Sequence, residues 1–121
     1  MATSDGPIRS HSTKTSEDDW HGSRAESMMD GATPQSLRRA FAWADPQSPD
    51  NKKTSYKFIH HEVDSKGKVG PANMRACINA IGVLNGGRRG ADIPKAHRRG
   101  VYNHLARHMR DAGHEPPSLE E

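Results

Sequence analysis

Four histidines are the residues of this chain best suited to chemistry. His104 and His108 are four residues apart in a segment with helical periodicity, so both imidazoles project from one face of that helix. His60 and His61 are adjacent in an extended segment and would supply two further nitrogen donors. Because imidazole nitrogens are common zinc ligands, one hypothesis from the sequence is a metal site formed by these four residues.

The surrounding residues weaken the metal hypothesis. The helix reads HLARH and lacks the glutamate that follows the first histidine in the metalloprotease pattern, and Cys77 is the only thiol of the chain. A histidine at the edge of an apolar helix face is more often packed and hydrogen-bonded than bound to a metal. We therefore expect no cofactor, and we treat zinc binding as the weaker interpretation.

Nucleophilic catalysis has no motif to support it. Cys77 falls on an apolar stripe, and no serine stands in a nucleophile-elbow pattern. Acid and base roles for His60, His61 and Glu62 stay open, because three-dimensional proximity decides them. The sequence favours a protein that is not an enzyme, with a metal-dependent activity as the alternative.

Basic residues in the loop NGGRRGADIP and in the helix after it form the second candidate site. Backbone N–H groups of the glycine-rich loop, its two arginines and the start of the next helix would together suit a phosphate. The spacing is not that of a phosphate-binding loop, however. The candidates for binding a partner or phosphate are Arg88, Arg89, Lys95, Arg98, Arg99, Arg107 and Arg110.

Two helices are expected to position these residues. The first begins at Pro71, ends at Gly86 and Gly87, and carries an apolar stripe of Met74, Cys77, Ile78, Ile81 and Leu84. The second begins at Asp92 and Pro94 and ends near Ala112. Its apolar sector holds Val101, Tyr102, Leu105, Met109 and Ala112, with His97, His104 and His108 along one edge and the arginines opposite.

A shorter helix and an extended segment precede them. Thr33 and Pro34 form a helix-start pattern, and Leu37, Ala40, Phe41 and Ala44 recur at helical spacing until Asp45-Pro46 ends the helix. After a linker, residues 55–63 are rich in strand-forming side chains. We expect these apolar side chains to be covered by the helices.

The N-terminal segment is the most polar part of the chain. Only 31% of all residues are hydrophobic and 5% aromatic, and residues 1–32 show no sustained period. We predict a flexible acidic tail over 1–32, with docking at Trp20 as its one anchor, and a single small helical domain over 33–119.

The predicted fold class is mainly α, with about three helices and a small β or extended element. The predicted core consists of Leu37, Phe41, Phe58, Ile59, Met74, Ile78, Ile81, Leu84, Val101, Leu105 and Met109.

Charge is divided unevenly along the chain. Residues 1–50 hold five basic and eight acidic side chains, whereas residues 51–121 hold thirteen basic and seven acidic ones. A basic half suits a polyanionic partner or an acidic protein surface, although it is also typical of an ordinary solvated surface.

One cysteine allows no disulfide framework, and no apolar run is long enough to cross a membrane. A reducing compartment is expected.

Three stretches resemble a known family. HSTKTSEDDW, RRAFAWADPQSPDNKKTSYKFIHHEV and ANMRACINAIGVLNGGRRGADIPKAHRRGVYNHLARHMRDAGHEPP are similar to a module of actinobacteriophages and related prophages. This module is associated with head-maturation (prohead) proteases and head-gene products. The resemblance extends from about His11 to Pro117.

The resemblance implies a role in phage head assembly. It suggests a module that attaches a maturation protease or scaffold to the capsid, with capsid, scaffold or protease proteins as partners and the host cytoplasm or the virion head as its location. A prohead protease is a larger β-rich hydrolase, so no catalytic residue is carried over to this chain. The alternative function is nucleic-acid binding through the loop of Arg88 and Arg89 and the last helix, mainly by contacts to phosphates.

Overall fold

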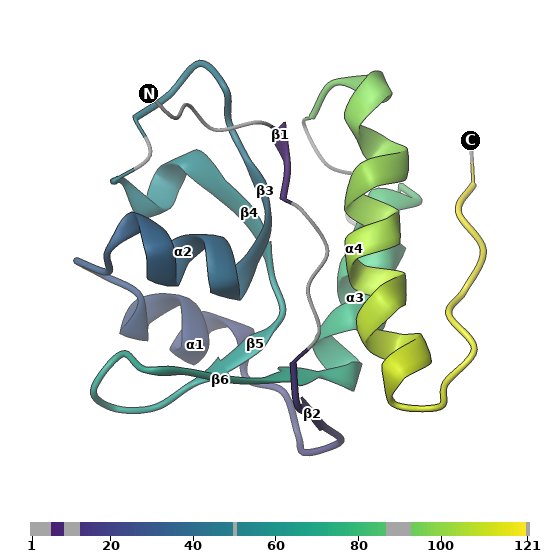
Figure 1. The fold of residues 1–121 in the computed structure, drawn as a ribbon, viewed down its shortest axis with the longest axis horizontal. Coiled ribbons are helices and arrows are strands. Elements are labelled where there is room, and N and C mark those ends of the chain that lie inside the picture. Colours follow the sequence, from purple (N-terminus) through teal and green to yellow (C-terminus); the bar gives the residue numbers. More distant parts are fainter. Residues whose placement is uncertain (1–5, 9–12, 50, 87–92, 121) are drawn as a thin grey trace.

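Strands form much more of this protein than the sequence suggested. The computed structural model describes residues 6–8, 13–49, 51–86 and 93–120, and it contains two three-stranded sheets together with four α-helices among those residues (Figure 1). The fold is therefore a mixture of α and β structure. The prediction of a mainly α fold with a small β element is wrong.

The two sheets differ in topology. In the first, β1 (Gly6–Pro7), β3 (Phe41–Ala44) and β4 (Tyr56–Ile59) are antiparallel, with β3 in the middle. In the second, β6 (Val69–Asn73) lies between β2 (Thr15–Ser16), which is parallel to it, and β5 (His61–Val63), which is antiparallel. Only His60 separates β4 from β5, so the chain passes from one sheet to the other at this residue.

Helices lie on both sides of the strands. The helices are α1 (Gly22–Met28), α2 (Pro34–Ala40), α3 (Met74–Leu84) and α4 (Arg98–Asp111), and short 3-10 turns are found at Lys53–Ser55 (η1) and Lys95–His97 (η3). Figure 1 shows α1 and α2 on one side and α3 and α4 on the other.

Two apolar clusters follow from this arrangement. One cluster joins α3 and α4 to strand residues such as Ala42 and Trp43, and the other joins α2 and the end of α1 to Phe41 and Tyr56. The strands separate the two clusters.

The helix predicted to run to Ala44 ends earlier. Thr33 caps α2 as expected, since its Oγ1 accepts a hydrogen bond from the Ser36 amide at 3.3 Å, but the helix stops at Ala40. The next four residues form β3, where Phe41 pairs with Ile59 and Trp43 with Lys57. Helical spacing was misleading here because pairing with strands on both sides overrides a weak local preference.

The helix predicted to begin at Pro71 begins later. Pro71 lies within β6, and α3 starts at Met74 after Asn73, whose Oδ1 accepts a hydrogen bond from the Ala76 amide at 3.0 Å. Pairing of β5 with β6 is irregular between His61 and Val63. A proline without an N–H donor is tolerated at such an irregular position of a strand.

Most of the predicted core is buried. Leu37, Phe41, Met74, Ile81, Leu84, Val101, Leu105 and Met109 are each at most 3% exposed. Phe58 and Ile59 are half-buried, because β4 lies at the edge of its sheet. Ile78 is the exception: it is 46% exposed, so its place in the predicted core is wrong. It lines a shallow pocket that also includes Trp20, which is half-buried against the outer side of α3.

Segment 1–32 has regular structure in its described part. β1, β2 and α1 belong to it, and Ile8 is only 6% exposed in the core. Close packing fixes β1 against α4: a Cβ placed on Gly100 would lie 2.6 Å from the Pro7 Cβ. Glycine at position 100 therefore allows the first strand to contact the last helix.

Candidate functional site

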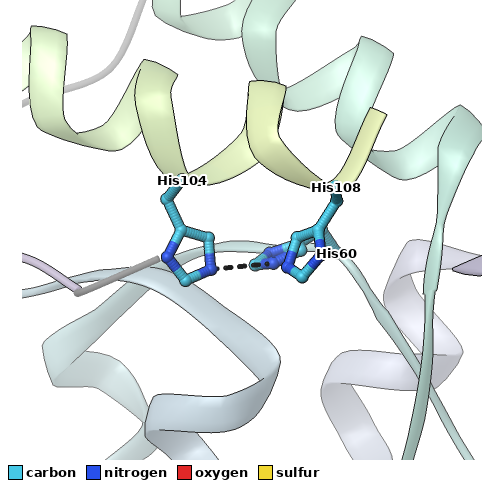
Figure 2. A group of neighbouring side chains, drawn as sticks. All are labelled: His60, His104 and His108. Carbon is cyan, nitrogen blue, oxygen red and sulfur yellow. Dashed lines mark hydrogen bonds between the residues drawn. The ribbon is translucent and has the colours of Figure 1, made fainter. Parts of the chain in front are cut away.

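Four histidine side chains meet in the interior between the two sheets and α4. His60 and His61 come from the junction of β4 and β5, and His104 and His108 come from α4. All four are 0% exposed. The His60 ring centroid lies 4.7 Å from that of His61, 4.9 Å from that of His104 and 5.0 Å from that of His108. We call these four residues the histidine cluster; Figure 2 shows three of them.

The backbone around His60 is held in an unusual conformation. Phe58 has a φ of 68°, the one positive φ of a residue other than glycine among the described residues. The left-handed region is unfavourable for an aromatic residue and is often retained at functional sites. The His60 amide donates to the Ala40 carbonyl at 3.0 Å, and its carbonyl accepts from the Asn73 amide at 2.7 Å. These contacts fix the junction from which both strand histidines project.

Three histidines use Nδ1 in the same way. His60 Nδ1 lies 2.9 Å from the Phe58 carbonyl oxygen, His61 Nδ1 lies 2.7 Å from that of Gly70, and His104 Nδ1 lies 2.8 Å from that of Ile8. A carbonyl oxygen can only accept, so we assign the proton of each ring to Nδ1. Nε2 of each neutral ring then carries a lone pair.

The Nε2 atoms of His60 and His104 face each other at 3.2 Å. Together with His108, these residues offer one nitrogen each within 4.8 Å of one another. The pKa of His60 is lowered well below its ordinary value, mainly because burial penalises the charged ring and further because His61, His104 and His108 surround it. The His60 ring is therefore neutral at pH 7.

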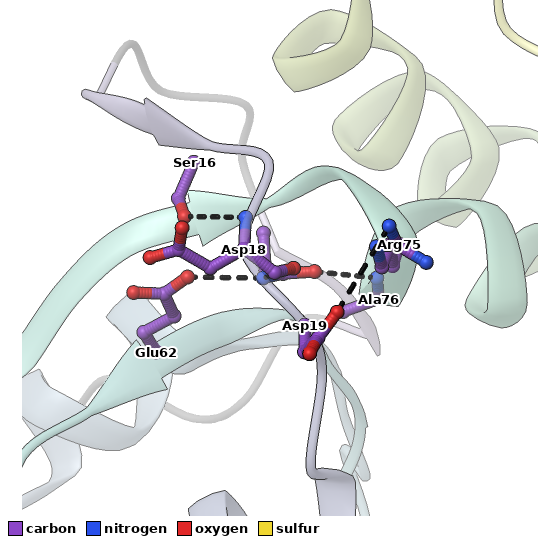
Figure 3. A network of polar contacts seen from close by, with 7 residues as sticks. Ser16, Asp18, Asp19, Glu62, Arg75 and Ala76 are labelled. Carbon is purple, nitrogen blue, oxygen red and sulfur yellow. Dashed lines mark hydrogen bonds and ion pairs between the residues drawn. The ribbon is translucent and has the colours of Figure 1, made fainter.

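Another buried polar residue, Asn73, fixes the elements beside the histidine cluster. The Asn73 side chain is 0% exposed, and its Nδ2 donates to the Asp18 carbonyl and to Glu62 Oε2, both at 2.9 Å. Nearby, Arg75 and Asp19 form an ion pair at 3.9 Å. Figure 3 labels Asp18, Glu62, Asp19 and Arg75 in this region. The network ties the segment after β2 to β5 and to the first turn of α3.

The basic residues predicted as a binding site occupy different environments. Arg88 and Arg89 lie outside the described residues. Arg98 is half-buried and donates to the Leu84 carbonyl at 2.8 Å and to the Glu120 carbonyl at 2.6 Å, so its guanidinium holds the end of α3 and the C-terminal segment. The exposed residues of the set are Lys95, Arg99, Arg107 and Arg110.

Cys77 is a packing residue. It is 0% exposed in the cluster between α3 and α4. Burial raises the pKa of its thiol to about 12, so the thiolate needed for nucleophilic attack or metal binding does not form at neutral pH.

Sequence reasoning found the histidines but missed the residues that orient them. Asn73 was overlooked, although asparagine just before an apolar helical stripe is a common N-cap. The other partners are the backbone carbonyl groups of Ile8, Phe58 and Gly70. Every residue has a backbone carbonyl group, so no sequence pattern could have identified these three.

Comparison with known proteins gives no match: no family model, no curated protein and no solved structure matches this chain. Among the helices of the described ranges, none has the length and apolar character needed to cross a bilayer. The features of this chain that bear on function are therefore the histidine cluster and the exposed arginines of α4.

Proposed function

We propose that this chain is a non-catalytic interaction module of phage or prophage head assembly. It binds an acidic surface of a capsid, scaffold or maturation-protease protein through the exposed arginines of α4, Arg99, Arg107 and Arg110. We call these three residues the α4 arginine surface. The proposal is supported by the sequence resemblance and by one structural observation: α4 presents these guanidiniums on the side opposite its buried face.

The chemistry of arginine suits such a contact. A guanidinium is always charged and can donate two parallel hydrogen bonds to one carboxylate. The Arg99 guanidinium lies 5.8 Å from the centroid of the Tyr102 ring, and Arg107 pairs with Asp111 at 3.4 Å on the surface. Exposed ion pairs of this kind are weak, so carboxylates of a partner can replace them.

Affinity capture with purified head proteins tests the proposal. The chain is immobilised and offered the purified products of the neighbouring head genes at physiological salt. We expect one of them to be retained, and the triple variant Arg99→Gln, Arg107→Gln, Arg110→Gln to weaken that retention at least tenfold. The matched control is Arg39→Gln, Lys57→Gln, Lys66→Gln, which removes the same charge at exposed positions elsewhere. Equal loss in both variants, or no retained protein, would refute the proposal.

Nucleic-acid binding is the alternative function, and it is tested by a separate experiment. Lys95 and the α4 arginine surface would contact phosphates, and the affinity would then fall steeply as salt rises because bound counterions are released. Gel shifts with duplex and single-stranded DNA at two salt concentrations measure this. A salt-sensitive shift, lost in the arginine triple variant, together with no retained head protein, would replace the assembly proposal with the nucleic-acid one.

A further inference from the structure

We propose that the histidine cluster is a structural zinc site, in which His60, His104 and His108 are ligands through one ring nitrogen each and His61 is the fourth. This goes beyond the surface interaction proposed above and does not depend on it.

His60 and His104 have fewer ring protons than their polar contacts require. His60 and His104 make three close polar contacts: Nδ1 of His60 to the Phe58 oxygen, Nδ1 of His104 to the Ile8 oxygen, and Nε2 to Nε2 at 3.2 Å. Each contact requires a positively polarised atom between the two heavy atoms, but two neutral imidazoles carry only two protons. A third proton would place a cation inside a fully buried group of histidines. A metal ion bound to both Nε2 atoms satisfies the third contact instead.

The spacing of the nitrogens suits zinc. Two imidazole nitrogens bound tetrahedrally at the usual Zn–N distance are about 3.3 Å apart, close to the 3.2 Å between the Nε2 atoms of His60 and His104. One nitrogen of His108 completes a set of three within 4.8 Å. This set of three does not include His61, whose ring lies 4.7 Å from that of His60 and 5.0 Å from that of His108. We assign the fourth position to His61 because its ring packs against both of these ligands.

The surroundings of the rings are those of metal ligands. A metal-bound histidine commonly donates its other N–H to a backbone carbonyl, which fixes the tautomer and the ring orientation. His60, His61 and His104 each have such a partner, on Phe58, Gly70 and Ile8 respectively. All three therefore direct Nε2, not Nδ1, away from the backbone.

Burial decides between a structural and a catalytic site. Catalytic zinc keeps one position open to water or substrate, whereas structural zinc is enclosed by protein ligands. Every member of the histidine cluster is 0% exposed, so no substrate reaches the ion. The ion would link the β4–β5 junction to α4, and through the carbonyl group of Ile8 it would also hold that residue, which directly follows β1.

Zinc analysis of the full chain, purified without an affinity tag, is the first experiment. After exchange into metal-free buffer and titration with ZnSO4, we expect about one tightly held zinc per chain. Free zinc at about one hundred times Kd should raise Tm by roughly 10 °C. With cobalt(II) in place of zinc, the visible absorption should be that of a tetrahedral site.

A conservative variant tests the ligands. His104→Asn keeps a donor near the position of Nδ1 for the Ile8 carbonyl but removes Nε2. We expect zinc affinity to fall at least a hundredfold and the zinc-dependent rise in Tm to disappear. His21→Asn is the matched control, because His21 is exposed and lies outside the cluster; its zinc binding should equal that of the original chain.

The result on the unmodified chain keeps the proposal falsifiable even if His104→Asn does not fold. Less than a tenth of a zinc ion per folded chain, with no rise in Tm, would overturn it and leave an uncharged group of packed histidines. Retention of zinc by folded His104→Asn at the original affinity would overturn it as well, since the ion would then be bound elsewhere.

Discussion

The two sides of α4 show how one helix can carry two kinds of polar residue for different purposes. On the inner side, His104 and His108 are fully buried, and so is Leu105. On the outer side, Arg99, Arg107 and Arg110 are exposed to solvent. The inner residues require partners at fixed positions, because buried polar groups lose contact with water, whereas the outer ones do not.

The inner side of α4 therefore contributes to the stability of the fold, and the outer side is available for binding a partner. Substitutions on the inner side should change the free energy of unfolding, while those on the outer side should change partner affinity and leave the fold intact.

The largest expected effect is on the inner side. Leu105 is 0% exposed in the cluster between α3 and α4. Leu105→Ala removes apolar contacts and leaves a cavity, so the free energy of unfolding should fall by about 3 kcal/mol. Urea denaturation measures it. Asn103→Ala, on the exposed side of the same helix, is the control and should stay within about 0.5 kcal/mol. A loss below about 1 kcal/mol for Leu105→Ala would show that the inner side is loosely packed.

The second effect is a pH dependence of the metal-free protein. The pKa of His60 is lowered in the folded state by burial and by His61, His104 and His108, which face it from β5 and α4. Below the unfolded pKa of about 6.5 the unfolded chain takes up a proton that the folded chain resists. Stability is therefore complete above that pH and is lost as pH falls towards the folded pKa, by about 1.4 kcal/mol per pH unit for this residue.

Urea titrations between pH 7.5 and 5 in the presence of a chelator measure this slope. A midpoint that does not change over that range would show that the histidine cluster is hydrated or already protonated in the folded protein.

The third effect distinguishes two neighbouring arginines at the start of α4. Arg98 donates to the Leu84 and Glu120 carbonyls, whereas Arg99 is exposed. Arg98→Gln should lower the free energy of unfolding by about 1 kcal/mol, because two carbonyl contacts are lost at a partly exposed site. Arg99→Gln should change it much less. Thermal melts of the two variants compare them, and equal Tm values would contradict the assignment of Arg98 to the fold.

The smallest effect is on the outer side. Arg107 pairs with Asp111 across one turn of α4, and its side chain is 50% exposed. Arg107→Gln should destabilise the protein by at most about 0.5 kcal/mol, because exposed ion pairs on helices are weak. Urea denaturation at low and moderate salt checks this. A loss above about 1.5 kcal/mol would mean that the α4 arginine surface belongs to the fold.

Helical periodicity predicted that α3 and α4 form, but their starts were placed too early: α3 begins at Met74 and not at Pro71, and α4 begins at Arg98 and not near Pro94. Periodicity failed where strands formed. The buried sector of Val101, Leu105 and Met109 was identified from spacing alone, since a helix repeats its faces regularly. Phe41 and Ala44 also had helical spacing, yet they lie in β3. Short strands depend on partners that are distant in sequence, such as Gly6 with Ala44 and Thr15 with Ala72, and no local pattern contains that information.

The candidate site was predictable in its residue types and not in its arrangement. The sequence placed His104 and His108 on one helix face and suggested His60 and His61 as companions. No sequence pattern shows that Ile8, ninety-six positions before His104, supplies the carbonyl group that orients the His104 ring.

By itself, the sequence determined which residues could act: a helix with histidines beside its apolar face and arginines opposite, because side-chain direction along a helix follows from its fixed geometry. Only the tertiary structure decided that the four histidines converge, that Arg98 turns inward, and that part of the N-terminal segment joins both sheets. Each of those outcomes depends on contacts between residues far apart in the chain, which are set by packing and by the requirement that buried polar groups be paired.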